Sequence, residues 1–223
     1  MFADDREKHY SPLLPVLAYV SSLIPEGAKV LELGPGTTPF HRSTHFVDLY
    51  KKGENYVVCD LNAGNLPFPD DYFDFVYTRH TMEDLYYPFA ALREMARVAR
   101  RGYIETPSPF AEVTRGIDGG STPTPWRGYH HHQWLVWSHA GELNFLKKIP
   151  LIEYVGGFSE EVIERTLANP CYWNTYFYWE GEVKFRERTY DNLTYGDEVI
   201  SALNQTVEPI HEFVQKLPGQ PAG

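Results

Sequence analysis

Short apolar runs, each closed by a polar or glycine-rich turn, recur along the first half of the chain. Five of them are β-prone: residues 29–33, 45–47, 56–59, 73–77 and 103–106. Between the last two, apolar residues recur at helical spacing over residues 88–101, and Gly102 is expected to end that helix. Strands that alternate with connections in this way predict a parallel, doubly wound sheet.

The connection between the first two strands is too short for a crossover helix. Residues 35–43 contain two prolines and several polar residues, so only a turn or a single helical turn fits there. Ahead of the first strand, Ser11 and Pro12 predict the N-cap and first position of a helix that ends near residues 25–27.

The second half of the chain has a different pattern. Residues 107–131 are rich in Gly, Pro, Ser and Thr without periodicity, which predicts a long functional loop. Two β-hairpins are expected, over residues 133–146 and 172–186, and two helices, over residues 159–169 and 193–216. We expect one domain over residues 1–223, with a core at 28–106 and an elaboration at 107–223.

Composition narrows the class of protein. The 223 residues are 43% hydrophobic and 22% charged, as in ordinary globular proteins. A net charge of −10 argues against nucleic acid or an anionic membrane as partner. Two cysteines, no apolar signal core and no apolar run long enough to span a membrane favour a cytoplasmic protein.

The ends of the first three strands carry candidate chemistry. Gly34 and Gly36 follow the first strand, Asp48 closes the second and Asp60 closes the third. Glycines let the backbone approach a ligand closely, and a carboxylate can accept both hydroxyl protons of a ribose. In an open α/β sheet this combination predicts an adenosine nucleoside site at the carboxyl ends of the strands.

These residues resemble the class I S-adenosylmethionine-dependent methyltransferases. The resemblance spans roughly residues 28–106 and rests on these segments: 30–36, Asp48, Asp60, 66–76, 79–85 and 91–98. It implies a Rossmann-like methyltransferase fold, an α/β doubly wound, mostly parallel sheet with added β-hairpin and C-terminal elements. The short first crossover is similar to a subset of this family found near carbohydrate and natural-product pathways.

The resemblance also implies roles for individual residues, with S-adenosyl-L-methionine as cofactor. Gly34 and Gly36 would form the turn under its methionine part, with Glu32 beside it. Asp48 would bind the ribose, while Asp60 and Leu61 would frame the adenine. His80 would lie close to the transferred methyl group.

A nicotinamide dinucleotide site fits the same strands less well. Its G-x-G-x-x-G pattern requires a small residue where Pro39 stands, and the acid that follows comes earlier than the usual spacing of about 20 residues.

The run His130–His131–His132 is the second candidate for chemistry. In an extended segment His130 and His132 would point one way and His131 the other. The cluster could bind a metal with Glu105 or Glu142, position a substrate or accept a proton, or simply start a hairpin. We assign no metal here and take His80, His130 and His132 as candidate catalytic residues.

The expected activity is O-methylation of a small sugar-like or secondary-metabolite hydroxyl, with a histidine as base. The expected partner is that small-molecule acceptor, and a homodimer is possible. Two alternatives are a catalytically silent cofactor-binding or scaffold subunit and a metal-dependent hydrolase built on the histidines.

Overall fold

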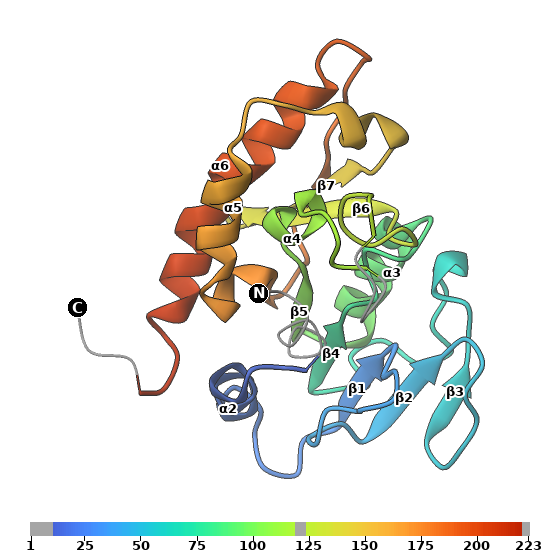
Figure 1. Cartoon of the computed structure of the whole chain (residues 1–223). Helices are drawn as coiled ribbons and strands as arrows, with labels where there is room; N and C mark the ends of the chain where they lie inside the picture. Colours follow the sequence, from blue (N-terminus) through green and yellow to red (C-terminus); the bar gives the residue numbers. More distant parts are fainter. Residues whose placement is uncertain (1–10, 119–123, 220–223) are drawn as a thin grey trace.

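A six-stranded mixed sheet forms the centre of the molecule. The computed structural model describes residues 11–118 and 124–219 (Figure 1). The sheet has the strand order β3-β2-β1-β4-β5-β8. The parallel strands are β1 (Val30–Leu33), β2 (His45–Asp48), β3 (Tyr56–Val58), β4 (Phe75–Arg79) and β5 (Arg101–Pro107). β8 (Asn174–Glu180) runs antiparallel to β5. The predicted α/β fold is confirmed.

The strand order reverses beside β1, because β2 lies on one side of it and β4 on the other. Open α/β sheets bind ligands at such a switch point, outside the carboxyl ends of the strands. The chain reaches β2 without any helix, as predicted, and the only helical segment in the described part between β1 and β4 is the 3-10 turn η1 (Leu61–Ala63). This edge of the sheet is therefore open to a ligand.

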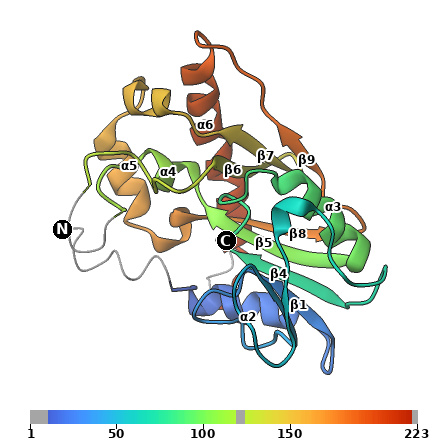
Figure 2. The ribbon, with the colours of Figure 1, turned by 90° about the vertical axis from the view of Figure 1, so that its right-hand side faces the viewer.

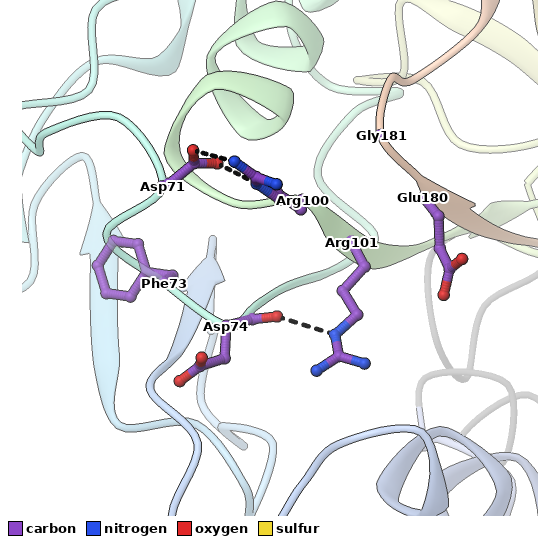
Figure 3. Close-up of a pocket in the computed structure, with 7 residues that line it drawn as sticks. All are labelled: Asp71, Phe73, Asp74, Arg100, Arg101, Glu180 and Gly181. Atoms are coloured by element: carbon purple, nitrogen blue, oxygen red, sulfur yellow. Dashed lines mark hydrogen bonds and ion pairs between the residues drawn. The ribbon is translucent and has the colours of Figure 1, made fainter.

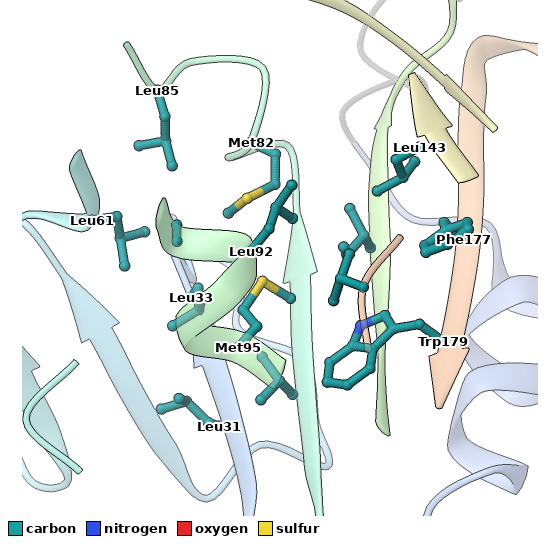
Figure 4. Packing of buried hydrophobic residues seen from close by; sticks show 14 of the residues in the cluster. Leu31, Leu33, Leu61, Met82, Leu85, Leu92, Met95, Leu143, Phe177 and Trp179 are labelled. Carbon is teal, nitrogen blue, oxygen red and sulfur yellow. The ribbon is translucent and has the colours of Figure 1, made fainter. Parts of the chain in front are cut away.

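Alternate side chains of the strands pack against helices on the two faces of the sheet. Leu31 and Leu33 face α3 (Pro88–Val98), whose Leu92 and Met95 lie in the same core cluster (Figure 4). Val30 faces the other side, where α2 (Leu14–Ser22) and the end of α6 (Tyr195–Val214) pack. The period of two along each strand thus supports a three-layer core.

A second, three-stranded sheet extends the core on the α3 side (Figure 2). Its order is β6 (Trp134–His139), β7 (Glu142–Lys147) and β9 (Phe185–Glu187). Phe145 joins the cluster around α3, whereas Leu146 joins a cluster with the remaining short helices. Those helices are α4 (Pro109–Val113), η2 (Pro150–Tyr154), α5 (Glu160–Leu167) and η3 (Pro170–Trp173).

The predicted end of the helix at Gly102 is wrong. Helix α3 ends at Val98, and Ala99 is already extended, with φ −150° and ψ 160°. Gly102 lies inside β5, where an added Cβ would come within 2.4 Å of the Val76 carbonyl oxygen. This glycine therefore allows close packing of neighbouring strands and does not stop a helix.

The hairpin predicted over residues 172–186 is also wrong, because its two strands join different sheets. β8 pairs with β5, and β9 pairs with β7 in parallel.

The predicted cap at Ser11 is wrong as well, since α2 has Leu13 at its N-cap. The predicted loop 107–131 contains α4, and its residues 119–123 lie outside the described part. The other hairpin and both later helices are confirmed.

None of the helices in the described ranges is long and apolar enough to cross a membrane.

Candidate active site

Every predicted cofactor residue lies at or near the carboxyl end of a parallel strand. Gly34 directly follows β1, Asp48 is the last residue of β2, and Asp60 lies two residues beyond β3. His80 directly follows β4. The structure brings them together around two adjoining cavities that share Gly34, Gly36 and His80.

The first of these, the Asp60 cavity, has a volume of about 320 Å³ and is lined by Asp48, Asp60 and Leu61. Asp48 Oδ1 accepts hydrogen bonds from the amides of Tyr50 (2.9 Å) and Lys51 (2.8 Å). Asp60 Oδ1 accepts the amide of Asn62 at 2.9 Å. In the described part, the side-chain hydrogen bonds of both aspartates go to Oδ1, so each carboxylate has a second oxygen for a ligand.

The second, the Glu32 cavity, has a volume of about 450 Å³ and is lined by Glu32, Tyr77 and Arg79 among others. Both carboxylate oxygens of Glu32 lie close to the Phe40 amide, at 3.2 and 3.0 Å. Burial raises the pKa of Glu32 to about 7, against the opposing effect of that hydrogen bond. A cationic group placed in this cavity would favour the ionised carboxylate.

The glycine turn separates the two cavities. Gly34 has φ +66°, and a Cβ there would come within 2.3 Å of Thr81 Oγ1. Gly36 has φ +52°, and no atom lies within 4 Å of a Cβ built on it. The left-handed backbone favours glycine at both positions, and Thr81 leaves no room for a side chain at Gly34. The space above Gly36 lets a ligand approach the main chain.

His80 is held in an unusual position between the cavities. Its φ is +51°, which is rare for any residue other than glycine, and its amide donates to the Glu105 carbonyl oxygen at 2.8 Å. Its Nε2 lies 2.9 Å from Asn174 Oδ1, and Asn174 Nδ2 donates to Glu105 Oε1 at 3.0 Å. This chain of bonds places the ring proton on Nε2 and leaves the Nδ1 lone pair as a proton acceptor.

Burial and the neighbouring Arg79 guanidinium lower the pKa of His80 well below its usual value. The imidazole is therefore neutral at pH 7, which is the form that a general base requires.

Glu105 belongs to this network and not to the histidine cluster. Besides Asn174, it accepts Arg79 Nε at 2.9 Å and the Tyr103 hydroxyl at 2.6 Å. Glu142 pairs with Arg186 on the β7–β9 side. Neither acid is within reach as the third metal ligand suggested by the sequence, and that suggestion is wrong.

The histidine cluster forms a turn and not an extended segment, so the predicted alternation of its side chains is wrong. His130 Nδ1 pairs with Asp118, whose Oδ2 also accepts the Trp126 indole at 3.1 Å. His131 and His132 instead turn together towards Asp84, which lines the Asp60 cavity. His132 therefore adjoins the predicted cofactor site, whereas His130 is bound to a separate acid.

A buried group of charges surrounds His132. Its Nδ1 lies 2.5 Å from Glu112 Oε1, and Lys148 Nζ donates to Glu112 Oε2 at 2.6 Å. Burial lowers the pKa of His132, but the carboxyl groups of Glu112, Glu83 and Asp84 together outweigh burial and raise it overall. Burial raises the pKa of Glu83 and that of Asp84. These surroundings favour a positive charge beside the Asp60 cavity.

A further cavity of about 500 Å³ lies at the opposite edge of the sheet, where β4 and β5 begin (Figure 3). Arg100 Nη2 pairs with Asp71 there at 3.0 Å, and Arg101 Nε donates to the Asp74 carbonyl oxygen at 3.2 Å. Asp74 Oδ2 also accepts the Lys29 amide at 2.7 Å, which connects the loop before β4 to the start of β1. The contacts of the two arginines attach the loop before β4 to the residues where α3 gives way to β5.

Sequence reasoning missed several residues around the site. Glu83 and Asp84 lie in the turn before α3, which begins only at Pro88. Arg79, Glu112 and Lys148 carried no local signal, because their partners are distant in sequence. The one signal in the sequence for Glu112 is that this acid follows the apolar residues Phe110 and Ala111.

The comparison with protein families decides the identity of the core. Residues 31–104 match the profile of a methyltransferase domain. The match identifies these residues as a methyltransferase domain, consistent with the class I S-adenosylmethionine-dependent methyltransferases. The match begins in β1 and ends in β5, so it covers the parallel strands and the residues at their carboxyl ends. The part of this protein beyond residue 104, including the histidine cluster, lies outside it.

Solved structures give weaker likenesses. A possible histamine N-methyltransferase from Thermotoga maritima is 23% identical, with 49% of this chain and 56% of that chain covered and a TM-score of 0.39. YcgJ from Bacillus subtilis is 21% identical (42% and 50% covered, TM-score 0.35). A methyltransferase from Mesorhizobium loti is 18% identical (64% and 65% covered, TM-score 0.37). The aligned part spans about half the length of the first two structures. Comparison with curated protein sequences finds no match.

The residues of the methyltransferase domain fit the cofactor that this family uses, S-adenosylmethionine. The two adjoining cavities suit an elongated ligand that bends over the glycine turn. Asp48 and Asp60 offer oxygens to hydroxyl and amino groups on one side. Glu32 offers a carboxyl group to an ammonium on the other.

Proposed function

We propose that this protein transfers the methyl group of S-adenosylmethionine to a hydroxyl of a small acceptor, with His80 as the base. The single observation that carries the proposal is the place of His80, which lines both cavities where they meet. The sulfonium group joins the adenosyl and methionine parts of the cofactor. A ligand that fills both cavities therefore has its reactive centre beside this imidazole.

Each part of the site has a task in this reaction. When bound, S-adenosylmethionine supplies a methyl group on a good leaving group. Asp48 and Asp60 hold the nucleoside, and Glu32 holds the amino group of the methionine part. His80 Nδ1 takes the proton of the acceptor hydroxyl, whose oxygen bonds to the methyl carbon as the carbon–sulfur bond breaks. The electron pair of the broken carbon–sulfur bond stays on the sulfur.

The acceptor is proposed to enter from the side of residues 107–118 and 124–132 and the second sheet. His131, His132 and Asp84 lie there, next to the Asp60 cavity. Polar and aromatic groups at this rim suit a sugar-like or secondary-metabolite hydroxyl.

The test separates cofactor binding from turnover. Asp60→Ala is expected to weaken the binding of S-adenosylhomocysteine at least tenfold in a calorimetric titration. His80→Asn is expected to keep that affinity and to lower turnover about 10²- to 10⁴-fold, since a general base contributes this much. Asparagine is chosen because it tolerates the positive φ of residue 80.

Turnover is measured as release of S-adenosylhomocysteine with a panel of small hydroxylated acceptors. If both variants bind and turn over as the wild type does, the site assignment falls. If the wild type binds S-adenosylhomocysteine but methylates no acceptor in the panel, the alternative of a catalytically silent binding subunit replaces the enzyme.

A further inference from the structure

Three potential metal ligands converge at the rim of the Asp60 cavity without bonding to one another. Asp84 Oδ1 lies 3.7 Å from His131 Nε2 and 3.8 Å from His132 Nε2. Both distances exceed the roughly 2.7–3.2 Å of an N–H···O hydrogen bond. The three ligand atoms nevertheless all lie within 4.8 Å of one another.

Glu112 and Lys148 fix the orientation of the His132 ring through its Nδ1 atom. Glu112 Oε1 lies 2.5 Å from its Nδ1, and Lys148 Nζ holds the other oxygen of Glu112 at 2.6 Å. In the neutral ring, which is the form that binds a metal, Nδ1 donates its proton to Glu112 and the Nε2 lone pair lies on the side of Asp84. Histidines that bind metals are commonly oriented in this way, by a carboxylate on the second ring nitrogen.

Two neighbouring carboxyl groups lack the partners that buried polar atoms normally have. Within the described residues, neither oxygen of Glu83 nor Oδ1 of Asp84 has a hydrogen-bond partner. Glu83 is only 1% exposed and interacts electrostatically with His132 and Asp84. Buried carboxylates require a hydrogen bond, an ion pair or a metal. The His132 lone pair and the unpartnered Asp84 oxygen lie at one site, and a cation satisfies both.

We propose that Asp84, His131 and His132 bind one divalent transition-metal cation, with Glu112 as the outer partner of His132. Two ligands bound to the same Zn²⁺ at about 2.0–2.1 Å in tetrahedral geometry lie roughly 3.4 Å apart, so small side-chain rotations close the site. Two imidazoles select Zn²⁺, Fe²⁺ or Ni²⁺ over Mg²⁺ and Ca²⁺, which prefer oxygen ligands. The sequence alone assigned no metal because Asp84 and Glu112 are distant from the histidines along the chain.

The place of the cation gives it a role that rests on the proposed function. Three protein ligands leave a coordination position open, and Asp84 lines the cavity shared with His80. An acceptor with two neighbouring oxygens, such as a vicinal diol or an α-hydroxy acid, would chelate the cation once its coordination expands from four ligands to five. The bound hydroxyl then loses its proton more easily to His80 Nδ1, and its oxygen is held towards the methyl group.

The test measures metal binding without any turnover. Chelator-treated protein is titrated with Zn²⁺ by calorimetry and with Co²⁺ by visible absorption, in the absence of cofactor. One ion per chain is expected. Asp84→Asn and His131→Gln should each weaken binding at least tenfold. Glu112→Gln should weaken it about 10- to 100-fold, the usual effect of losing an outer partner. Mg²⁺ should not compete.

His130→Gln is the matched control, because His130 is the adjacent histidine and pairs with Asp118 instead. It should bind Zn²⁺ like the wild type. Absence of Zn²⁺ binding by the wild type, or undiminished binding in Asp84→Asn and His131→Gln, overturns the proposal. A loss confined to His130→Gln would also overturn it, since the ion would then belong to Asp118. His131 is half-exposed, so its replacement leaves the fold intact.

Titration with S-adenosylhomocysteine distinguishes this proposal from the proposed function. If the protein binds S-adenosylhomocysteine but not Zn²⁺, only the proposal of the metal site is rejected. If the protein binds Zn²⁺ but not S-adenosylhomocysteine, the proposed function is rejected and the proposal of the metal site is supported. His131→Gln should lose the metal and keep its affinity for S-adenosylhomocysteine, because His131 does not line either cavity.

Discussion

Glu32 links burial to the pH dependence of the molecule. Its carboxyl group is 3% exposed, and its pKa of about 7 lies above the ordinary value of 4.5. Between pH 4.5 and 7 the folded protein keeps a proton that the unfolded chain releases, so the free energy of unfolding falls as the pH rises through this window. The loss is on the order of 3 kcal/mol, because one pKa unit corresponds to about 1.4 kcal/mol.

We expect Glu32→Gln to remove this loss, since an amide stays neutral at every pH. Urea unfolding at pH 5 and pH 8 should show a smaller fall in the free energy of unfolding for Glu32→Gln than for the wild type. Glu26→Gln is the control, because Glu26 is exposed. Parallel pH profiles for Glu32→Gln and the wild type would show that Glu32 does not titrate in this range.

The residues that sequence could identify share one property: they are local. Gly34, Gly36, Asp48 and Asp60 each follow an apolar run directly, so strand prediction alone places them at one edge of the sheet. His132 was noticed as part of a histidine run, but its partners Glu112 and Asp84 come from other segments. Pairings between distant segments depend on packing, which a single sequence does not display.

At the scale of elements, Gly102 shows how packing overrides a local signal. A glycine after a basic helix end is typical of a helix stop, yet here it lies within β5. A Cβ at this position would meet the Val76 carbonyl oxygen at 2.4 Å and the Trp179 ring at 2.8 Å. The close approach of β4, β5 and β8 therefore depends on the missing side chain.

Gly102→Ala is expected to lower the free energy of unfolding by about 2–3 kcal/mol, the usual cost of overpacking a core. Gly156→Ala is the matched control, because no atom lies within 4 Å of a Cβ built there. It should change stability by no more than about 0.5 kcal/mol. Both values are obtained from urea unfolding. Equal stability of the two variants would contradict the packing argument.

The elements predicted well are those whose pattern is internal to one segment. The parallel strands, α3 and the β6–β7 hairpin all follow from periodicity and turn residues. The second hairpin failed because β8 and β9 are adjacent in sequence but pair with β5 and β7. A turn at Gly181 predicts a reversal of the chain, but it does not determine which strand becomes the partner.

At the scale of the whole molecule, the matched methyltransferase core and the later elements share one hydrophobic cluster. Phe145 of β7 lies 5.4 Å from Phe89 of α3 between ring centroids, and Phe89 stacks on Phe185 of β9 at 5.3 Å. Trp179 of β8 is in the same cluster. Because neither part buries this surface alone, we expect the chain to unfold as a single unit, in line with the prediction of one domain.

Phe145→Ala tests this expectation, because it removes a fully buried ring at the junction of the two parts. The free energy of unfolding should fall by about 3–5 kcal/mol. Circular dichroism, tryptophan fluorescence and S-adenosylhomocysteine binding should all be lost at the same urea concentration, lower than for the wild type. Val207→Ala, on the exposed side of α6, is the control and should shift stability by no more than about 0.5 kcal/mol. A variant that loses fluorescence first and keeps cofactor binding would instead show that residues 28–106 fold independently of the later elements.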